Sequence, residues 1–385
     1  METRKKSASS NAAAQFECEC CRDVEALSFE HRIPRRDFLK TVGGVVIGAG
    51  AVAAGLPIGR VWAEPKNVDA ATRAASADAA AAKAAASGAP ESLVKTLFET
   101  LTPGQRETIC FPWDHQDPKL GLLRTRVSAN WNITDHFIVD DFYTDDQRAI
   151  VRGIFEGIIN PEWHKRIDQQ LYDDAGGYGE QNSIAIFGQP GSDQFEFVMT
   201  GRHMTIRCDG NTGQHVAFGG PIFYGHAADG FNEGPTHPGN VFWPQAQAAN
   251  KLFEMLDGKQ QEQALLRTGL PPESHVGFRG KDGPFQGISV RDLSGDQRDH
   301  LQDVVNMLVE PYRQGDRDEA LACLKAQGGL ETCHLAYYAQ QDIGNDHVWD
   351  IWRLEGPSFV WHYRGAPHVH VWVNVADDPS VKLNA

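Results

Sequence analysis

Two histidines near the end of the chain, His368 and His370, have the spacing of a pair of metal ligands. The residues 368–375 predict a strand, and alternate side chains of a strand share a face, so the two imidazoles lie together, with Cα atoms about 6.5–7 Å apart. Neutral imidazole binds zinc, copper and iron. One divalent transition metal, with zinc, copper or iron as candidates, is therefore the predicted cofactor. The alternative is a strand whose histidines only make hydrogen bonds.

Two imidazoles do not complete a metal site, so a third ligand is expected from another strand. His203 is the first candidate, and His226 and His347 follow it. Glu355, in a predicted turn after Arg353, is the candidate catalytic residue, because a carboxylate beside a metal can act as a general base or hold a histidine in one tautomer. A salt bridge that stabilises the turn is the alternative for Glu355.

Several common reaction classes lack their motifs in this chain. There is no G-x-S-x-G, P-loop, H-E-x-x-H or G-x-G-x-x-G sequence, which argues against standard hydrolase, NTPase and Rossmann folds. The leading hypothesis is a histidine-coordinated metal protein, with metal-dependent hydrolysis as one reaction. Copper or iron redox chemistry would use the same nitrogens. A non-catalytic protein that binds a small solute, and a structural protein of the cell envelope, are the alternatives outside catalysis.

The elements that must position these residues fall into helical and strand blocks. Capping boxes predict helix starts at residues 102–105, 144–147 and 294–297, where a Thr or Ser and the Gln three residues later cap the helix reciprocally. Strands are predicted in blocks over 184–224 and 347–375. The separation of these blocks predicts the α+β class, with a mostly antiparallel sheet and helices packed on it. We expect a single large domain over 91–385 and no internal repeat of it.

The N-terminus has the pattern of a twin-arginine signal. Arg35 and Arg36 precede Phe-Leu and a lysine, and an apolar stretch follows over residues 41–56. A helix of that length spans about 24 Å, short of the ~30 Å of a bilayer core, so a permanent membrane anchor is not expected. Residues 1–63 are the predicted signal peptide and 64–90 an alanine-rich linker. The twin-arginine translocase is thus a predicted partner, and the periplasm the predicted compartment.

The charge of the chain argues against one class of partner, and its cysteines suggest a disulfide. The chain carries a formal charge of −15, and the part after residue 63 has 27 Lys and Arg against 44 Asp and Glu. Nucleic acid is therefore not an expected partner. An oxidising compartment permits disulfides, and Cys323 with Cys333 is the local candidate pair.

Five motifs in order carry a resemblance to a known family. In chain order, the motifs are Leu101-Thr102-Pro103-Gly104-Gln105-Arg106, Ile186-Phe187-Gly188-Gln189-Pro190, Gly201-Arg202-His203-Met204, Trp352-Arg353-Leu354-Glu355-Gly356-Pro357 and Pro367-His368-Val369-His370-Val371-Trp372. Over nearly the whole mature chain, this order resembles the domain of unknown function 3500 family. That family typically has His-His where this chain has Arg202-His203, and Asn before the last motif's histidines where this chain has Pro367. The resemblance supports His203, His368 and His370 as the metal ligands and implies no established reaction.

Overall fold

The computed structural model describes residues 89–210, 216–226, 240–342, 347–365 and 368–381, which belong to one compact unit. The predicted signal peptide, residues 1–63, and nearly all of the predicted linker, 64–90, lie outside the described residues. Among the helices that are described, none combines the length and the apolar character needed to cross a bilayer.

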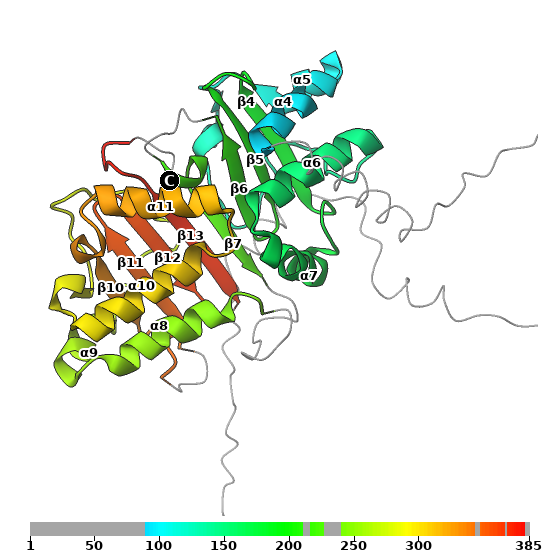
Figure 1. The fold of residues 1–385 in the computed structure, drawn as a ribbon. Coiled ribbons are helices and arrows are strands. Elements are labelled where there is room, and N and C mark those ends of the chain that lie inside the picture. The colour runs from blue at the N-terminus through cyan, green and yellow to red at the C-terminus, as the bar shows by residue number, and fades with distance from the viewer. Residues whose placement is uncertain (1–88, 211–215, 227–239, 343–346, 366–367, 382–385) are drawn as a thin grey trace, which may run out of the picture. The chain divides into compact units, whose positions relative to one another are not determined.

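The described residues build the fold on one large sheet, to which they contribute eleven strands (Figure 1). Its path runs β1-β4-β5-β6-β7-β13-β12-β11-β10-β8, and β9 pairs with β10. The strands are β1 (Cys110–Phe111), β4 (Asn182–Gly188), β5 (Phe195–Gly201), β6 (Met204–Asp209), β7 (Ile222–His226), β8 (Leu265–Leu266), β9 (Ile288–Ser289), β10 (His334–Tyr338), β11 (Ile351–Gly356), β12 (Phe359–Arg364) and β13 (Val369–Val375). A separate hairpin joins β2 (Gln116–Asp117) to β3 (Gly121–Leu122).

Eight α-helices are present in the described part of the chain. They are α4 (Pro90–Thr100), α5 (Pro103–Ile109), α6 (Asp145–Ile158), α7 (His164–Ala175), α8 (Trp243–Met255), α9 (Gly258–Ala264), α10 (Gly295–Val309) and α11 (Gln314–Ala326). The three predicted capping boxes begin α5, α6 and α10, and Asp257 and Gln260 form a fourth at α9.

The α+β class holds, but the expectation of a mostly antiparallel sheet needs correction. The sheet is mixed, because β1 pairs with β4 in parallel and β8 pairs with β10 in parallel. Parallel neighbours need a crossover connection. Helices α6 and α7 lie in the connection from β1 to β4, and α10 and α11 lie in that from β8 to β10. The short strands β1 and β8 gave no periodic signal of their own, which is why the parallel pairs were not expected.

The two faces of the sheet differ sharply in chemistry. One face packs its apolar side chains, among them Ile186, Trp352 and Val371, under the helices, where they form the main hydrophobic core. Figure 1 shows the helices gathered over this face. The other face has two smaller apolar clusters, which include Phe187 and Tyr338, but it also buries many polar side chains, such as Arg207 and His362, each 2% exposed or less. Irregular chain from the 110–144 and 265–294 segments contacts that face and supplies polar partners. We call it the polar face.

The fold contains an internal duplication, contrary to our expectation. The order helix, helix, short parallel strand, irregular segment, two helices and four antiparallel strands occurs once over 90–226 and again over 243–375. From one edge to the centre the sheet runs β1-β4-β5-β6-β7, and from the other edge the corresponding strands run β8-β10-β11-β12-β13 in the same order. The antiparallel β7–β13 pair lies at the centre. The two halves are therefore related by a pseudo-twofold axis through the β7–β13 pair.

Paired glutamines join the capping boxes within each half. The amides of Gln105 and Gln147 hydrogen-bond each other at 2.9 and 3.1 Å, and those of Gln260 and Gln297 at 3.0 and 2.8 Å. Each pair ties the start of one helix to the start of another. Gln147 also donates to the carbonyl of Thr100, as Gln297 does to that of Met255. The glutamines are structural caps, and the duplication repeats their arrangement bond for bond.

The four cysteines of the described residues are free thiols. Cys323 and Cys333, the candidate pair, are both buried, and the Cys333 sulfur accepts a hydrogen bond from Gln327 instead.

We expect Gln147→Ala to lower the free energy of unfolding by about 2–4 kcal/mol, because it removes several hydrogen bonds and leaves buried partners unpaired. Gln297→Ala in the second half should do the same. The exposed Gln169, whose side chain donates to Asp173 on its own helix, provides the control. Urea denaturation curves measure the effect, and equal midpoints for Gln147→Ala and Gln169→Ala would contradict it.

Candidate metal centre

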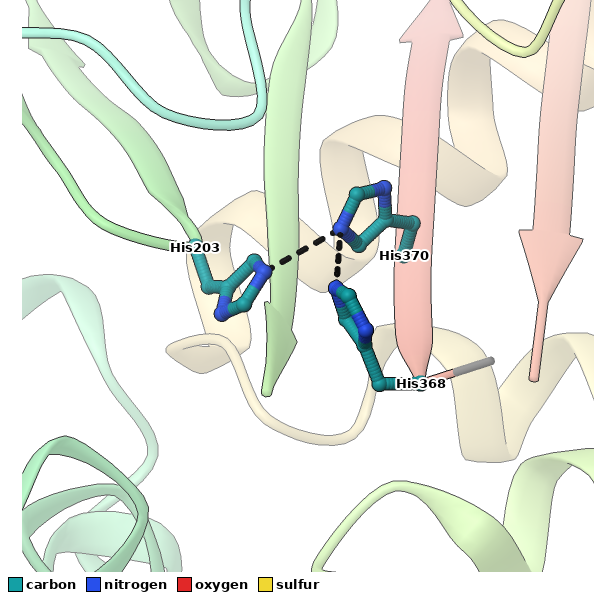
Figure 2. A group of neighbouring side chains, drawn as sticks. All are labelled: His203, His368 and His370. Atoms are coloured by element: carbon teal, nitrogen blue, oxygen red, sulfur yellow. Dashed lines mark hydrogen bonds between the residues drawn. The ribbon is translucent and has the colours of Figure 1, made fainter. Parts of the chain in front are cut away.

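Three histidines meet on the polar face. His203, His368 and His370 are each less than 5% exposed, and one ring nitrogen from each lies within 4.8 Å of the others. The Nε2 atom of His370 lies 3.1 Å from Nε2 of His203 and 2.9 Å from Nε2 of His368 (Figure 2). In the described part of the chain, no carboxylate or thiol joins this cluster. It is a three-nitrogen site that could hold a metal ion.

The sheet explains how the three side chains come together. His368 and His370 come from the start of β13, two residues apart, so both point to the polar face as their spacing predicts. His203 belongs to the two-residue turn between β5 and β6, and its backbone N–H donates to the carbonyl of Ala129 at 2.9 Å. Its φ of 52° is left-handed, an uncommon conformation for a residue other than glycine.

The strand β7 passes between the turn and β13, and its glycine keeps the space open. Gly225 pairs with His370 across the β7–β13 ladder. A Cβ atom at position 225 would collide with the carbonyl oxygen of Val369. Phe223, two residues earlier on the same strand, stacks edge-on against the His370 ring at 5.1 Å between centroids. Only glycine at 225 lets β7 lie this close to the histidine strand.

Two carboxylates hold the far nitrogens of two of the histidines. Asp174, at the end of α7, bonds Nδ1 of His203 and also accepts from Nε of Arg202 at 3.0 Å. Glu273 accepts from Nδ1 of His370 at 2.9 Å. Each histidine thus turns Nδ1 to a carboxylate and Nε2 to the cluster, the arrangement that orients metal-bound histidines in proteins.

Glu273 has further partners that fix its position. Its Oε2 atom accepts from the indole of Trp372 at 3.0 Å and lies 3.4 Å from Nε of Arg364. Arg364 in turn is paired with His370 across the β12–β13 ladder. The site therefore has two parallel chains of contacts, from an arginine through a carboxylate to a histidine.

The surroundings set the protonation of the cluster. Burial lowers the pKa of His370 well below its usual value, and the positive charge of Arg364 lowers it further. Burial, followed by the neighbouring His370 and His203, also lowers the pKa of His368. Burial alone would raise the pKa of Asp174, but His203 and Arg202 outweigh it and hold that pKa below its usual value. The site thus combines neutral imidazoles on His368 and His370 with an ionised carboxylate at Asp174.

The structure does not bring His226 or Glu355 to the cluster. His226 pairs with Val369 and so points to the opposite face from His370, where its Nε2 contacts Oδ1 of Asn240 at 3.0 Å. Glu355 lies on the polar face, but two strands and four residues from His370, or about 16 Å between Cα atoms. It pairs with Arg279 at 2.8 Å. His347 is exposed and stacks on Trp349.

A family model described as a protein of unknown function (DUF3500) matches residues 84–375. The chain belongs to the domain of unknown function 3500 family. No curated protein and no solved structure matches it. The matched region of this family member contains the three histidines and both carboxylates.

Sequence reasoning found the histidines of this DUF3500 protein but missed Asp174 and Glu273. Asp174 lies in the last turn of α7, and Glu273 lies in an irregular segment. Neither has a spacing that links it to a histidine in the sequence, so only the fold reveals their role.

Proposed function

We propose that the protein binds one divalent transition metal ion through Nε2 of His203, His368 and His370. One observation carries the proposal: Nε2 of His203 and of His370 face each other at 3.1 Å while both Nδ1 atoms contact carboxylates. An ionised carboxylate accepts hydrogen bonds and donates none. Each Nδ1 therefore carries a proton, and when the two rings are neutral each Nε2 presents a lone pair. Two lone pairs at this distance repel, and a cation between them turns that repulsion into attraction.

The distances support this assignment. Metal–nitrogen bonds of about 2.0–2.1 Å at tetrahedral angles place two nitrogens about 3.3 Å apart. The separations of His370 Nε2 from the other two Nε2 atoms, 2.9 and 3.1 Å, require only a small outward movement of the rings, and the third pair, His203 and His368, lies within 4.8 Å. Neutral imidazole suits zinc, copper and iron alike. A site with three protein ligands keeps a coordination position open, and the ion supplies Lewis-acid chemistry of the kind used in hydrolysis.

We expect the full-length protein, purified after maturation through its own export route, to contain close to one metal ion per chain by plasma mass spectrometry. The variants His203→Ala, His368→Ala and His370→Ala should each remain folded and lose most of that metal, because each removes one of three ligands. His226→Gln, a change of a buried histidine on the opposite face, is the matched control and should keep it. Absence of metal from the parent protein, even after reconstitution with zinc, copper and iron salts, would overturn the proposal.

The carboxylates should tune affinity without being ligands. Asp174→Asn and Glu273→Gln keep the shape of each side chain but weaken its hold on the histidine proton. We expect each variant to retain one site and to bind the metal about 10–100-fold more weakly, the usual effect of losing such a partner. Competition with a chromogenic chelator measures the affinity. Unchanged affinity in both variants would show that the carboxylates play no part in the site.

We also infer that the protein is exported folded by the twin-arginine translocase and works in the periplasm. The Arg35-Arg36 pair, the following Phe-Leu and the short apolar stretch support this. Export of a folded chain is also compatible with metal loading before translocation.

Replacing Arg35 and Arg36 together by lysine should leave the precursor in the cytoplasm, as judged by immunoblots of cell fractions. Arg32→Lys, just outside the motif, is the control and should be exported normally. Equal periplasmic amounts of the double variant and the parent would refute this route.

A further inference from the structure

A second group of buried polar side chains lies on the polar face beside the histidine cluster. Arg353 on β11 pairs with His362 on β12, and His362 pairs with Trp372 on β13. The three side chains therefore share the face of His370. From His370, the Cα atom of His362 is about 8 Å away and that of Arg353 about 12 Å away, by strand spacing and rise. Arg353 and His362 are 2% and 1% exposed.

Arg353 leaves hydrogen-bond donors unused in this buried setting. Its Nη2 donates to the carbonyl of His275 and lies 3.4 Å from Glu355. Its Nε and Nη1 have no hydrogen-bond partner among the residues that the structure describes. The same holds for Nδ1 of His362. Unmade hydrogen bonds of a buried charged group are costly, so these atoms indicate a ligand that the chain itself does not provide.

A buried arginine with a structural role looks different on this same face. Arg207 donates from Nε to the carbonyl of Pro221 at 2.7 Å, from Nη1 to Glu196 at 2.9 Å and from Nη2 to the carbonyl of Arg126 at 2.6 Å. All three of its nitrogens are occupied. Arg353 is therefore not explained as a packing arginine of the same kind.

The local charge balance favours an anion. Among the residues that the structure describes, Glu355 is the one carboxylate within 4 Å of the Arg353 guanidinium, and it is shared with Arg279, whose Nε lies 2.8 Å away. Two guanidinium groups thus share one carboxylate. At the histidine cluster, Arg202 offsets Asp174 and Arg364 offsets Glu273, so the charge of a bound divalent ion is left uncompensated by these neighbours. Both features attract negative charge to the same region of the polar face.

We propose that Arg353 and His362 form a recognition site for the anionic group of a small ligand, a carboxylate or a phosphate, beside the three-histidine centre. The guanidinium donates N–H groups to the anion's oxygens, as arginine does for both anion types. The position of this anion site next to a metal ion rests on the proposed function. If both are present, the ligand of the metal centre is a small organic acid or a phosphate ester. Binding of the anion itself needs no metal.

The test uses the full-length mature protein, both metal-loaded and stripped with a chelator, and titrates it with sodium acetate or sodium phosphate by calorimetry at constant ionic strength. We expect saturable binding of at least one of these anions to the stripped protein. The anion that binds more tightly identifies the ligand's anionic group as a carboxylate or a phosphate. Arg353→Met should weaken that binding at least tenfold and leave the metal content unchanged. Arg267→Met, which removes an exposed arginine, is the charge-matched control and should bind normally.

His362→Phe provides a second variant that keeps the ring volume and removes the nitrogens, and it decides the matter if Arg353→Met does not fold. Weaker anion binding in His362→Phe supports the site. No saturable binding of either anion to the stripped parent protein, or equal affinity in the parent and both folded variants, overturns it. A protein that binds the anion and no metal would contradict the metal proposal alone, so the two failures are distinguishable.

Discussion

The pairing of β7 with β13 holds the two halves of this protein together and creates its site. The two strands run antiparallel at the centre of the sheet, with Gly225 opposite His370. The second half contributes His368 and His370 from β13, and the first contributes His203 from the β5–β6 turn. Neither half contains all three histidines of the candidate metal centre. The centre therefore depends on the closeness of two strands that are more than 140 residues apart in sequence.

The duplication makes the fold symmetric, but the chemistry is not. The turn between β11 and β12 corresponds to the turn that carries His203, because both follow a glycine of the preceding strand, Gly356 and Gly201. Ser358 occupies the position of His203 there and donates from its hydroxyl to the carbonyl of Ala376. One turn is thus a structural contact and the other part of a candidate metal centre. The two halves thus share a scaffold, but only the first places a histidine of the candidate metal centre in this turn.

The division between apolar and polar faces explains why the site lies where it does. Helices satisfy their own backbone groups and offer mainly apolar side chains to the sheet, so the face beneath them is a hydrophobic core. Irregular segments offer carbonyls and carboxylates as well as apolar side chains, such as the carbonyl of His275 for Arg353 and Glu273 for His370. Buried histidines and arginines need such partners. They are found on the face that the irregular segments cover.

The sequence predicted features whose signal is local and missed those set by long-range pairing. The alternation of His368 and His370 and the Thr-to-Gln caps depend on neighbours within a few residues, and both predictions agree with the fold. The parallel edge strands have only two residues each and no periodicity. β10 was missed because His334–Tyr338 follows a glycine-rich turn without clear alternation.

Asp174 and Glu273 reach their histidines across 29 and 97 residues of chain, a distance over which spacing carries no information. The duplication did leave a trace, since Leu-Phe-Glu-x-Leu-x-x-x-Gln-x-Glu occurs at 97–107 and again at 252–262. Six shared residues in eleven are apparent once the fold supplies the alignment.

X-ray absorption spectroscopy at the edge of the bound metal, on the full-length mature protein, tests the central claim most directly. The account predicts three imidazole nitrogens at about 2.0–2.1 Å, as for zinc, with any remaining ligand a light atom. Loss of one imidazole from that shell should follow His203→Ala. A metal coordinated by thiolate sulfur, or one whose imidazole count does not change in that variant, would contradict the three-histidine centre.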